Sequence, residues 1–86
     1  MASSELAWEH VDSSNIERVS YAEDTQILAV KFRNGGLYTY TGVSLNAYLS
    51  LKGAESVGKY LNQVIKVMNP YQRHNSEDEL RAFLAQ

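Results

Sequence analysis

Two stretches of alternating apolar residues meet at Asn34-Gly35-Gly36, and this junction constrains the fold more than any other part of the sequence. The stretches are residues 26–33 (QILAVKFR) and 37–43 (LYTYTGV). Asn-Gly between two such runs favours a tight hairpin, because the central residues of the turn need positive φ angles. A third run, residues 16–21 (IERVSY), precedes them across the polar turn AEDT. We therefore predict a three-stranded antiparallel meander.

Helical periodicity follows the predicted strands. Residues 44–52 carry apolar side chains at Leu45, Tyr48 and Leu49, and we expect Gly53 to end this helix in a left-handed conformation. The next helix has the clearest pattern in the chain. Its apolar residues are Val57, Tyr60, Leu61, Val64, Ile65 and Met68. Pro70 ends this helix, because proline lacks an N–H and disfavours the helical conformation at the preceding residue.

The C-terminal residues predict one more helix. Ser76-Glu77-Asp78-Glu79 has the pattern of a capping box, and Leu80, Phe83 and Leu84 follow at helical spacing. Residues 71–75 are expected to form an extended tail before it. The predicted fold class is α+β, with a three-stranded antiparallel meander, two packed helices and an extra C-terminal helix.

The length of 86 residues predicts one domain, flanked by short segments. We place an N-terminal arm at residues 1–12, the domain at residues 13–74 and the capped amphipathic helix at residues 75–86. The absence of cysteine excludes disulfides, thiolate catalysis and cysteine-ligated metal sites, and we expect no cofactor. No apolar run approaches the roughly 18 residues that a membrane span needs, so we expect a cytoplasmic protein without a membrane partner.

Charge is distributed unevenly along the chain. Residues 31–74 contain six basic residues and one acidic residue, a net charge of +5, although the whole chain has a net charge of −2. The remaining residues hold nine acidic and two basic side chains. A basic middle segment raises the local concentration of anions such as phosphates. The alternative is an ordinary solvated surface whose cations pair with the acidic ends.

The predicted hairpin also assigns side chains to the two faces of the sheet. With a two-residue loop, at either Asn34-Gly35 or Gly35-Gly36, Tyr38 and Tyr40 share a face with Lys31 and Arg33. Rings that stack with bases beside cations that bind phosphates are typical of a nucleic-acid-binding surface. In the alternative interpretation both tyrosines belong to the core, since tyrosine is common in strands and in cores.

Sequence motifs for catalysis are incomplete. Residues 53–60 (GAESVGKY) differ from a phosphate-binding loop, because Tyr60 replaces the Ser or Thr and a helix precedes the segment. Ser56 to Lys59 spells S-x-x-K without the other β-lactamase elements. His10 and His74 are expected on the surface, far apart in the sequence. We therefore expect a protein that is not an enzyme.

One combination of residues follows the pattern of a known family. It comprises Ser13-Ser14-Asn15-Ile16, Val19, Tyr21, Leu28-x-Val30-x-Phe32, Tyr38-x-Tyr40, Val43, Tyr48, Ala54-Glu55-Ser56, Gly58-Lys59-Tyr60, Asn62, Ile65 and Pro70-Tyr71-x-Arg73. In this combination the chain resembles the KTSC domain, a bacterial or phage module named after the C-terminus of some lysyl-tRNA synthetases. It departs from the pattern at Leu45, Leu61 and Asn69, where the family often has Pro, Phe and Tyr. The resemblance implies RNA binding, because of the association with synthetases.

Our first hypothesis is a non-enzymatic binding module for RNA, single-stranded nucleic acid or a nucleotide. In this hypothesis Tyr38 and Tyr40 stack with bases. The expected phosphate ligands are Lys31, Arg33, Lys59 and Arg73, and the expected base or sugar contacts are Ser14, Asn15 and Asn62.

The alternative hypothesis is a protein-interaction or self-association module. Its apolar contacts with a homo-oligomer or another protein would come from Trp8, Leu80, Phe83 and Leu84. A phage-type inhibitor or a nucleotide-sequestering protein is a further form of this alternative.

Overall fold

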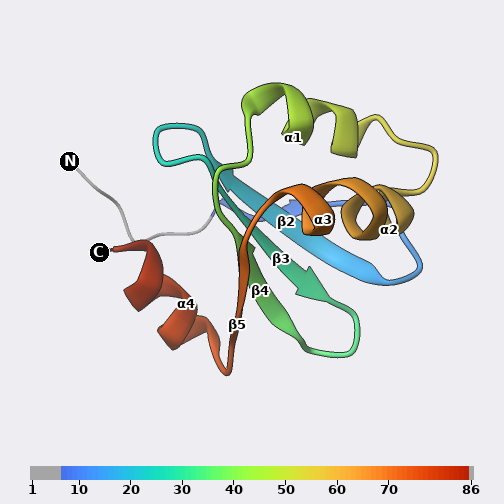
Figure 1. The fold of residues 1–86 in the computed structure, drawn as a ribbon. Coiled ribbons are helices and arrows are strands. Elements are labelled where there is room, and N and C mark those ends of the chain that lie inside the picture. Colours follow the sequence, from blue (N-terminus) through green and yellow to red (C-terminus); the bar gives the residue numbers. More distant parts are fainter. Residues whose placement is uncertain (1–6, 86) are drawn as a thin grey trace.

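The computed structural model describes residues 7–85, which form a five-stranded antiparallel sheet with helices on both faces (Figure 1). The strands, in spatial order, are β1 (Glu9–His10), β2 (Ile16–Ala22), β3 (Ile27–Phe32), β4 (Leu37–Tyr40) and β5 (Tyr71–His74). The helices are α1 (Leu45–Lys52), α2 (Val57–Tyr60), the π-helical segment η1 (Leu61–Ile65), α3 (Lys66–Met68) and α4 (Glu77–Leu84). Helices α1, α2 and α3 lie together over one face of the sheet, and α4 lies on the other side.

The α+β class is confirmed, but the predicted arrangement of strands is incomplete. The expected extended tail is strand β5, which pairs with β4, and part of the expected arm is strand β1, which pairs with β2. Both strands are short and mostly exposed, so neither shows the alternation of apolar residues by which β2, β3 and β4 were predicted. Residues 1–6 of the predicted arm lie outside the described residues.

The loop between β3 and β4 has three residues, and this corrects the predicted faces of the sheet. The Phe32 N–H donates to the Gly36 carbonyl at 2.8 Å, and Gly35, not Asn34, has a positive φ of 94°. The register therefore pairs Val30 with Tyr38 and Leu28 with Tyr40. A shift of one residue moves every side chain to the opposite face. The prediction that the tyrosines share a face with Lys31 is wrong, because both rings lie on the face covered by α1, α2 and α3.

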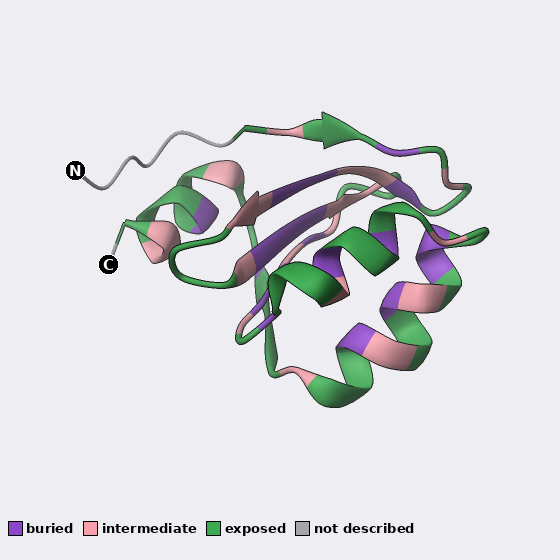
Figure 2. Ribbon diagram, turned by 90° about the horizontal axis from the view of Figure 1, so that it is seen from above, coloured by how far each residue is buried: buried purple, intermediate pink, exposed green. Residues whose placement is uncertain are grey.

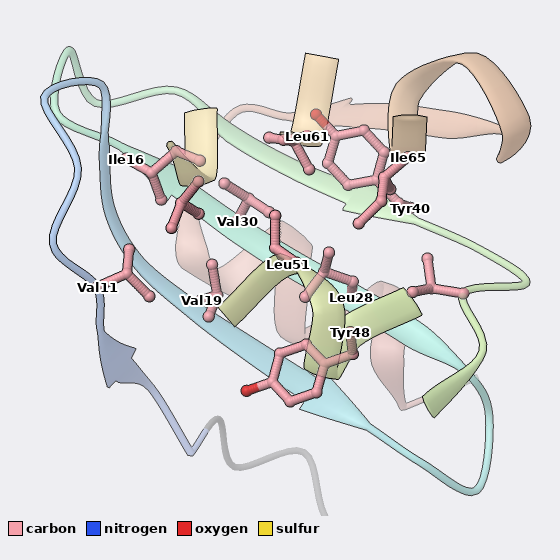
Figure 3. Close-up of a cluster of buried hydrophobic side chains, with 12 residues drawn as sticks. Val11, Ile16, Val19, Leu28, Val30, Tyr40, Tyr48, Leu51, Leu61 and Ile65 are labelled. Atoms are coloured by element: carbon pink, nitrogen blue, oxygen red, sulfur yellow. The ribbon is translucent and has the colours of Figure 1, made fainter. Parts of the chain in front are cut away.

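The main core fills the space between this face and those three helices (Figure 3). Its buried residues include Ile16, Val19, Leu28, Val30, Tyr40, Leu51, Leu61 and Ile65. Figure 2 shows that the buried residues of the helices lie on the sides facing the sheet. Helix α1 contributes Tyr48 and Leu51, whereas the predicted Leu45 and Leu49 are exposed, because α1 rests on the sheet with a different side.

The second predicted helix is confirmed as one run from Val57 to Met68, with a π-helical segment in its middle. The Lys66 N–H bonds to the Leu61 carbonyl, five residues back, where an α-helix would bond four residues back. Met68, which the pattern placed with the apolar residues, is 76 % exposed. No helix within residues 7–85 has the length and apolar character that a bilayer span requires.

Helix α4 packs against the opposite face of the sheet. Leu80 is fully buried against Ala29 and Leu37, and Trp8 and Leu84 pack around this cluster. The Trp8 Nε1–H donates to a Glu77 carboxylate oxygen at 3.0 Å. The predicted Ser76 cap is confirmed, since its hydroxyl accepts from the Glu79 N–H. Trp8, Leu80 and Leu84 were expected to contact a partner, but they pack against their own sheet. Phe83, which was expected to do the same, packs on the His74 ring.

The prediction that His74 lies on the surface is wrong. This side chain is 4 % exposed, and its Nε2 lies 2.8 Å from the Thr39 hydroxyl. Pairing of β5 with β4 places His74 beneath α4, which the sequence between Pro70 and Ser76 does not indicate. Burial lowers the pKa of His74 from its ordinary value of 6.5, and the nearby Glu79 carboxylate opposes this effect.

We predict that His74 makes the fold less stable in mild acid. Because the folded state favours the neutral imidazole, the unfolded chain binds more protons as the pH falls through about 6.5, and the free energy of unfolding decreases. Urea titrations at pH 7.5 and pH 5.5 measure the difference in the free energy of unfolding between the two pH values. This difference should shrink in His74→Gln and persist in His10→Gln, which alters an exposed histidine. An undiminished pH dependence in His74→Gln would show that another group causes it.

We predict that Gly35→Ala lowers the free energy of unfolding by about 1–2 kcal/mol, the cost of a left-handed conformation for a residue with a Cβ. The added Cβ would meet no atom within 4 Å, so steric overlap does not contribute. The control is Gly53→Ala, since Gly53 has a φ of −90° and not the expected left-handed conformation. That control should be neutral or stabilise by up to about 1 kcal/mol. Equal effects of the two substitutions in urea titrations would contradict the left-handed conformation of Gly35.

Candidate functional site

A groove of about 520 Å³ opens between the β3–β4 hairpin, strand β5 and the segments η1 and α3. We call it the hairpin groove. Its lining residues are Phe32, Asn34, Gly35, Gly36, Tyr38, Tyr40, Asn62, Lys66, Tyr71 and Arg73. The groove lies on the helix-covered face of the sheet, at the end where the helices leave the hairpin and β5 accessible.

Four of the predicted site residues meet in this groove: Tyr38, Tyr40, Asn62 and Arg73. Strand pairing brings three of them together, because Tyr38 pairs with Arg73 and Tyr40 pairs with Tyr71 across β4 and β5. Paired residues point to the same face of a sheet. Asn62 reaches the groove from the π-helical segment η1.

Three tyrosine rings form a graded series from the core to the surface. Tyr40 is 2 % exposed, and burial, with smaller contributions from Tyr38 and Tyr71, raises its pKa to about 12. The Tyr71 ring centroid lies 5.9 Å from that of Tyr40 and 6.1 Å from that of Tyr38. Tyr71 is 50 % exposed, so it presents the accessible ring of the groove. Tyr40 is thus a core tyrosine, as the alternative interpretation of the sequence held.

Two cations share the groove with the exposed ring, and one of them lies over it. Lys66 Nζ lies 5.3 Å from the centroid of the Tyr71 ring, and Arg73 is two residues farther along the same strand. The ion pairs among residues 7–85 join Glu9, Glu17 and Glu77 to Arg18, Lys31 and Lys52, and none includes Lys66 or Arg73. No acidic side chain of the described residues lines the groove. Its electrostatic environment therefore favours an anion.

Three further predicted residues lie together outside the groove. Ser14, Asn15 and Arg33 line a second hollow of about 400 Å³, which also contacts Phe32 and Asn34. We call it the loop hollow, because the loop before β2 forms one of its walls. Phe32 and Asn34 line both cavities, so the two are neighbours.

Two predicted phosphate ligands lie elsewhere. Lys31 pairs with Leu37 and therefore points to the α4 face of the sheet, where its Nζ is 3.9 Å from a Glu17 carboxylate oxygen. Lys59 is exposed on α2 and lines neither cavity. The corrected register explains why Lys31 lies on the face opposite to the tyrosines, since the prediction that it lies beside them assumed a two-residue loop.

Sequence reasoning missed Tyr71 and Lys66 as site residues. Tyr71 entered the prediction only as part of Pro70-Tyr71 in the family pattern, and Lys66 only as one of the six basic residues of the segment 31–74. The available signal was the order of Pro70, Tyr71 and Arg73, because a residue pair at i and i+2 shares a face if the segment is a strand. Nothing in the residues 71–75 themselves showed that they pair with β4.

The groove offers a defined set of interactions. Tyr71 provides a ring for stacking, Asn34 and Asn62 provide amides for hydrogen bonds, and Lys66 and Arg73 provide cations. Within residues 7–85, no group of three or more His, Cys, Asp or Glu side chains is placed to hold a metal ion. The arrangement is suited to a ligand that combines a flat ring with an anionic group.

The model of the KTSC domain family matches residues 12–68 of the chain. The chain belongs to this family. A KTSC domain protein from Yersinia pestis has a similar crystal structure, with a TM-score of 0.76 and 30 % sequence identity over 83 % of this chain and all of that chain. A protein from Tsukamurella paurometabola is 39 % identical over 56 residues, which are 65 % of this chain and 84 % of that protein. An uncharacterized protein from Stutzerimonas stutzeri is 38 % identical over 56 residues, 65 % of this chain and 79 % of that protein.

Only part of the groove of this KTSC domain lies within the segment that the family model matches. The hairpin residues, Asn62 and Lys66 lie within the matched segment, whereas Tyr71 and Arg73 follow its end at Met68. The exposed ring of the groove and one of its cations therefore come from β5, a strand beyond the segment that the family model matches.

We predict that the two ends of the tyrosine series differ in their contribution to stability. Tyr40→Ala should lower the free energy of unfolding by about 3–5 kcal/mol, because it removes a buried ring from the core. Tyr71→Ala should cost about 1 kcal/mol or less, because half of that side chain is already in water. Urea denaturation measures both. A small loss in Tyr40→Ala would contradict the placement of Tyr40 in the core.

Proposed function

We propose that this KTSC domain is a non-enzymatic binding module whose hairpin groove holds one nucleotide unit, either free or within single-stranded nucleic acid. The observation that carries the proposal is the half-exposed Tyr71 ring, which has Lys66 over it and Arg73 in the same groove. Neither cation joins an ion pair among residues 7–85. A base supplies the flat ring and a phosphate supplies the anion that this combination fits.

The size and composition of the groove support this proposal. Its volume of about 520 Å³ falls within the roughly 300–1,000 Å³ of small-molecule sites. A base stacked on an aromatic side chain gains about 1–3 kcal/mol, largely irrespective of its identity. Tyr38, which is half-buried next to Tyr71, provides a second ring edge against which the base can rest.

Asn62 supports recognition of the base or sugar by hydrogen bonds. Its side chain lines the groove from η1, where the helix has a π-helical turn. Such turns are rare and are often found at functional sites. An amide offers both a donor and an acceptor, so it can pair with the edge of a base. The lining residues within 7–85 include no carboxylate, imidazole or thiol, which favours binding over catalysis.

Self-association is a second candidate function, and a different observation favours it. Leu45 and Leu49 on α1 and Val67 and Met68 on α3 are large apolar side chains exposed to solvent. Sedimentation velocity over a wide concentration range tests this candidate, which a constant monomeric mass would exclude. The residues first expected to mediate such contact on α4 pack against the sheet instead.

We predict that adenosine monophosphate and the tetranucleotide rA4 bind the hairpin groove at 50 mM salt. Chemical-shift perturbations in ¹⁵N spectra should centre on Asn62, Tyr71 and Arg73. Tyr71→Ala should weaken binding by about 1–3 kcal/mol through loss of stacking, whereas Tyr71→Phe keeps the ring and the affinity. Arg73→Gln should weaken binding and flatten its salt dependence.

The control is Arg81→Gln, which removes an exposed cation of α4 on the opposite side of the sheet and should leave binding unchanged. The proposal fails if neither probe perturbs the groove signals at millimolar concentration. It also fails if Tyr71→Ala remains folded and binds both probes like the unaltered protein.

A further inference from the structure

The loop hollow adjoins the hairpin groove, since the two cavities share lining residues. Phe32 and Asn34 belong to both linings. The Phe32 ring also meets the Tyr38 ring edge-on, with their centroids 5.4 Å apart. A ligand that extends out of the hairpin groove past Phe32 therefore enters the loop hollow.

Arg33 is the cation of the loop hollow, and the protein holds it in place. Its Nε donates to the Ser13 carbonyl at 2.9 Å, and its backbone N–H donates to the Asn15 carbonyl at 2.8 Å. Its terminal guanidinium nitrogens are free of ion pairs to described residues. An oriented cation loses less conformational entropy on binding than a freely rotating one.

One side of the long helix extends from the hairpin groove to the loop before β2. Gly58, Asn62 and Lys66 recur at intervals of four residues, and such residues lie on the same side of a helix. Asn62 and Lys66 line the hairpin groove, whereas Gly58 lies next to Asn15, which lines the loop hollow. A Cβ at position 58 would lie 3.5 Å from Asn15 Nδ2 and 3.6 Å from Ser13 Oγ, so the helix and the loop pack closely there.

We infer that the two cavities form one path for single-stranded nucleic acid of at least two nucleotides. This inference rests on the proposed function. The hairpin groove holds one base on Tyr71, and Arg33 contacts the phosphate of the adjacent nucleotide in the loop hollow, where Ser14 and Asn15 supply hydrogen bonds. A free mononucleotide uses only the first cavity, whereas a strand supplies an anionic phosphate for each.

The path contains cations at both ends and no acidic side chain among the described residues. Lys66 and Arg73 lie in the hairpin groove and Arg33 lies in the loop hollow. A carboxylate between the two cavities would repel the phosphates of a strand. A lining with cations and no carboxylate therefore suits a strand, which carries several phosphates, better than a ligand with one anionic group. This arrangement distinguishes a strand from a free nucleotide as the ligand.

The test compares adenosine monophosphate with the tetranucleotide rA4 on the full chain. Binding of rA4 should be tighter, and its log affinity should fall more steeply with log salt, by about 0.7 for the added phosphate contact. Backbone signals of Ser14, Asn15 and Arg33 should shift with rA4 and stay unchanged with the monophosphate. These measurements need no variant, so they decide the inference even if a variant fails to fold.

Arg33→Gln provides the matched substitution, since it removes the charge from an exposed side chain. It should weaken rA4 binding, lower the salt slope by about 0.7 and leave monophosphate binding unchanged. The control is Lys59→Gln, because Lys59 is also exposed but lines neither cavity. It should leave the rA4 affinity and salt slope unaltered.

Two negative results are distinguishable. If both probes bind with the same affinity and salt slope, and the Ser14, Asn15 and Arg33 signals stay fixed, the inference is overturned while the proposed function stands. If neither probe binds, the proposed function fails and the inference fails with it.

Discussion

The pairing of Val30 with Tyr38 and of Leu28 with Tyr40 is the constraint on which the rest of the structure depends. A three-residue loop with Gly35 in a left-handed conformation sets this register. It directs Tyr40 into the core beneath α1, α2 and α3 and leaves Tyr38 at the margin of that core. Because β5 then pairs with β4, Tyr71 and Arg73 join the same face. The hairpin groove is a direct consequence of this pairing.

The fold separates cations that are paired from cations that remain available. Lys31 lies near Glu17 and Lys52 contacts Glu9, so acidic residues from the N-terminal part of the chain pair with two cations of the basic middle segment. Arg33, Lys66 and Arg73 have no such partner among residues 7–85. Some cations of that segment are therefore paired with acidic residues, as the alternative interpretation of the sequence held. The others form a surface that attracts anions.

Several features could be predicted because they depend on neighbouring residues. Ser76 caps α4 through its side-chain oxygen, and Pro70 follows the end of the long helix, as their positions in the sequence predict. The four predicted residues that line the groove, Tyr38, Tyr40, Asn62 and Arg73, came from residue types and from the family pattern. Tyr71 and Lys66 were missed, since their contact requires β5 to lie beside β4. His74 was misplaced on the surface for the same reason.

The sequence alone determined where the three central strands and the helices form and which family the pattern resembles. These features follow from local preferences of the backbone and from the periodic spacing of apolar residues. Tertiary structure decided the register of the hairpin, the addition of two short edge strands and the face on which each cation lies. Loops of two and three residues are both compatible with Asn-Gly-Gly, and only the packing of whole faces selects between registers that differ by one residue.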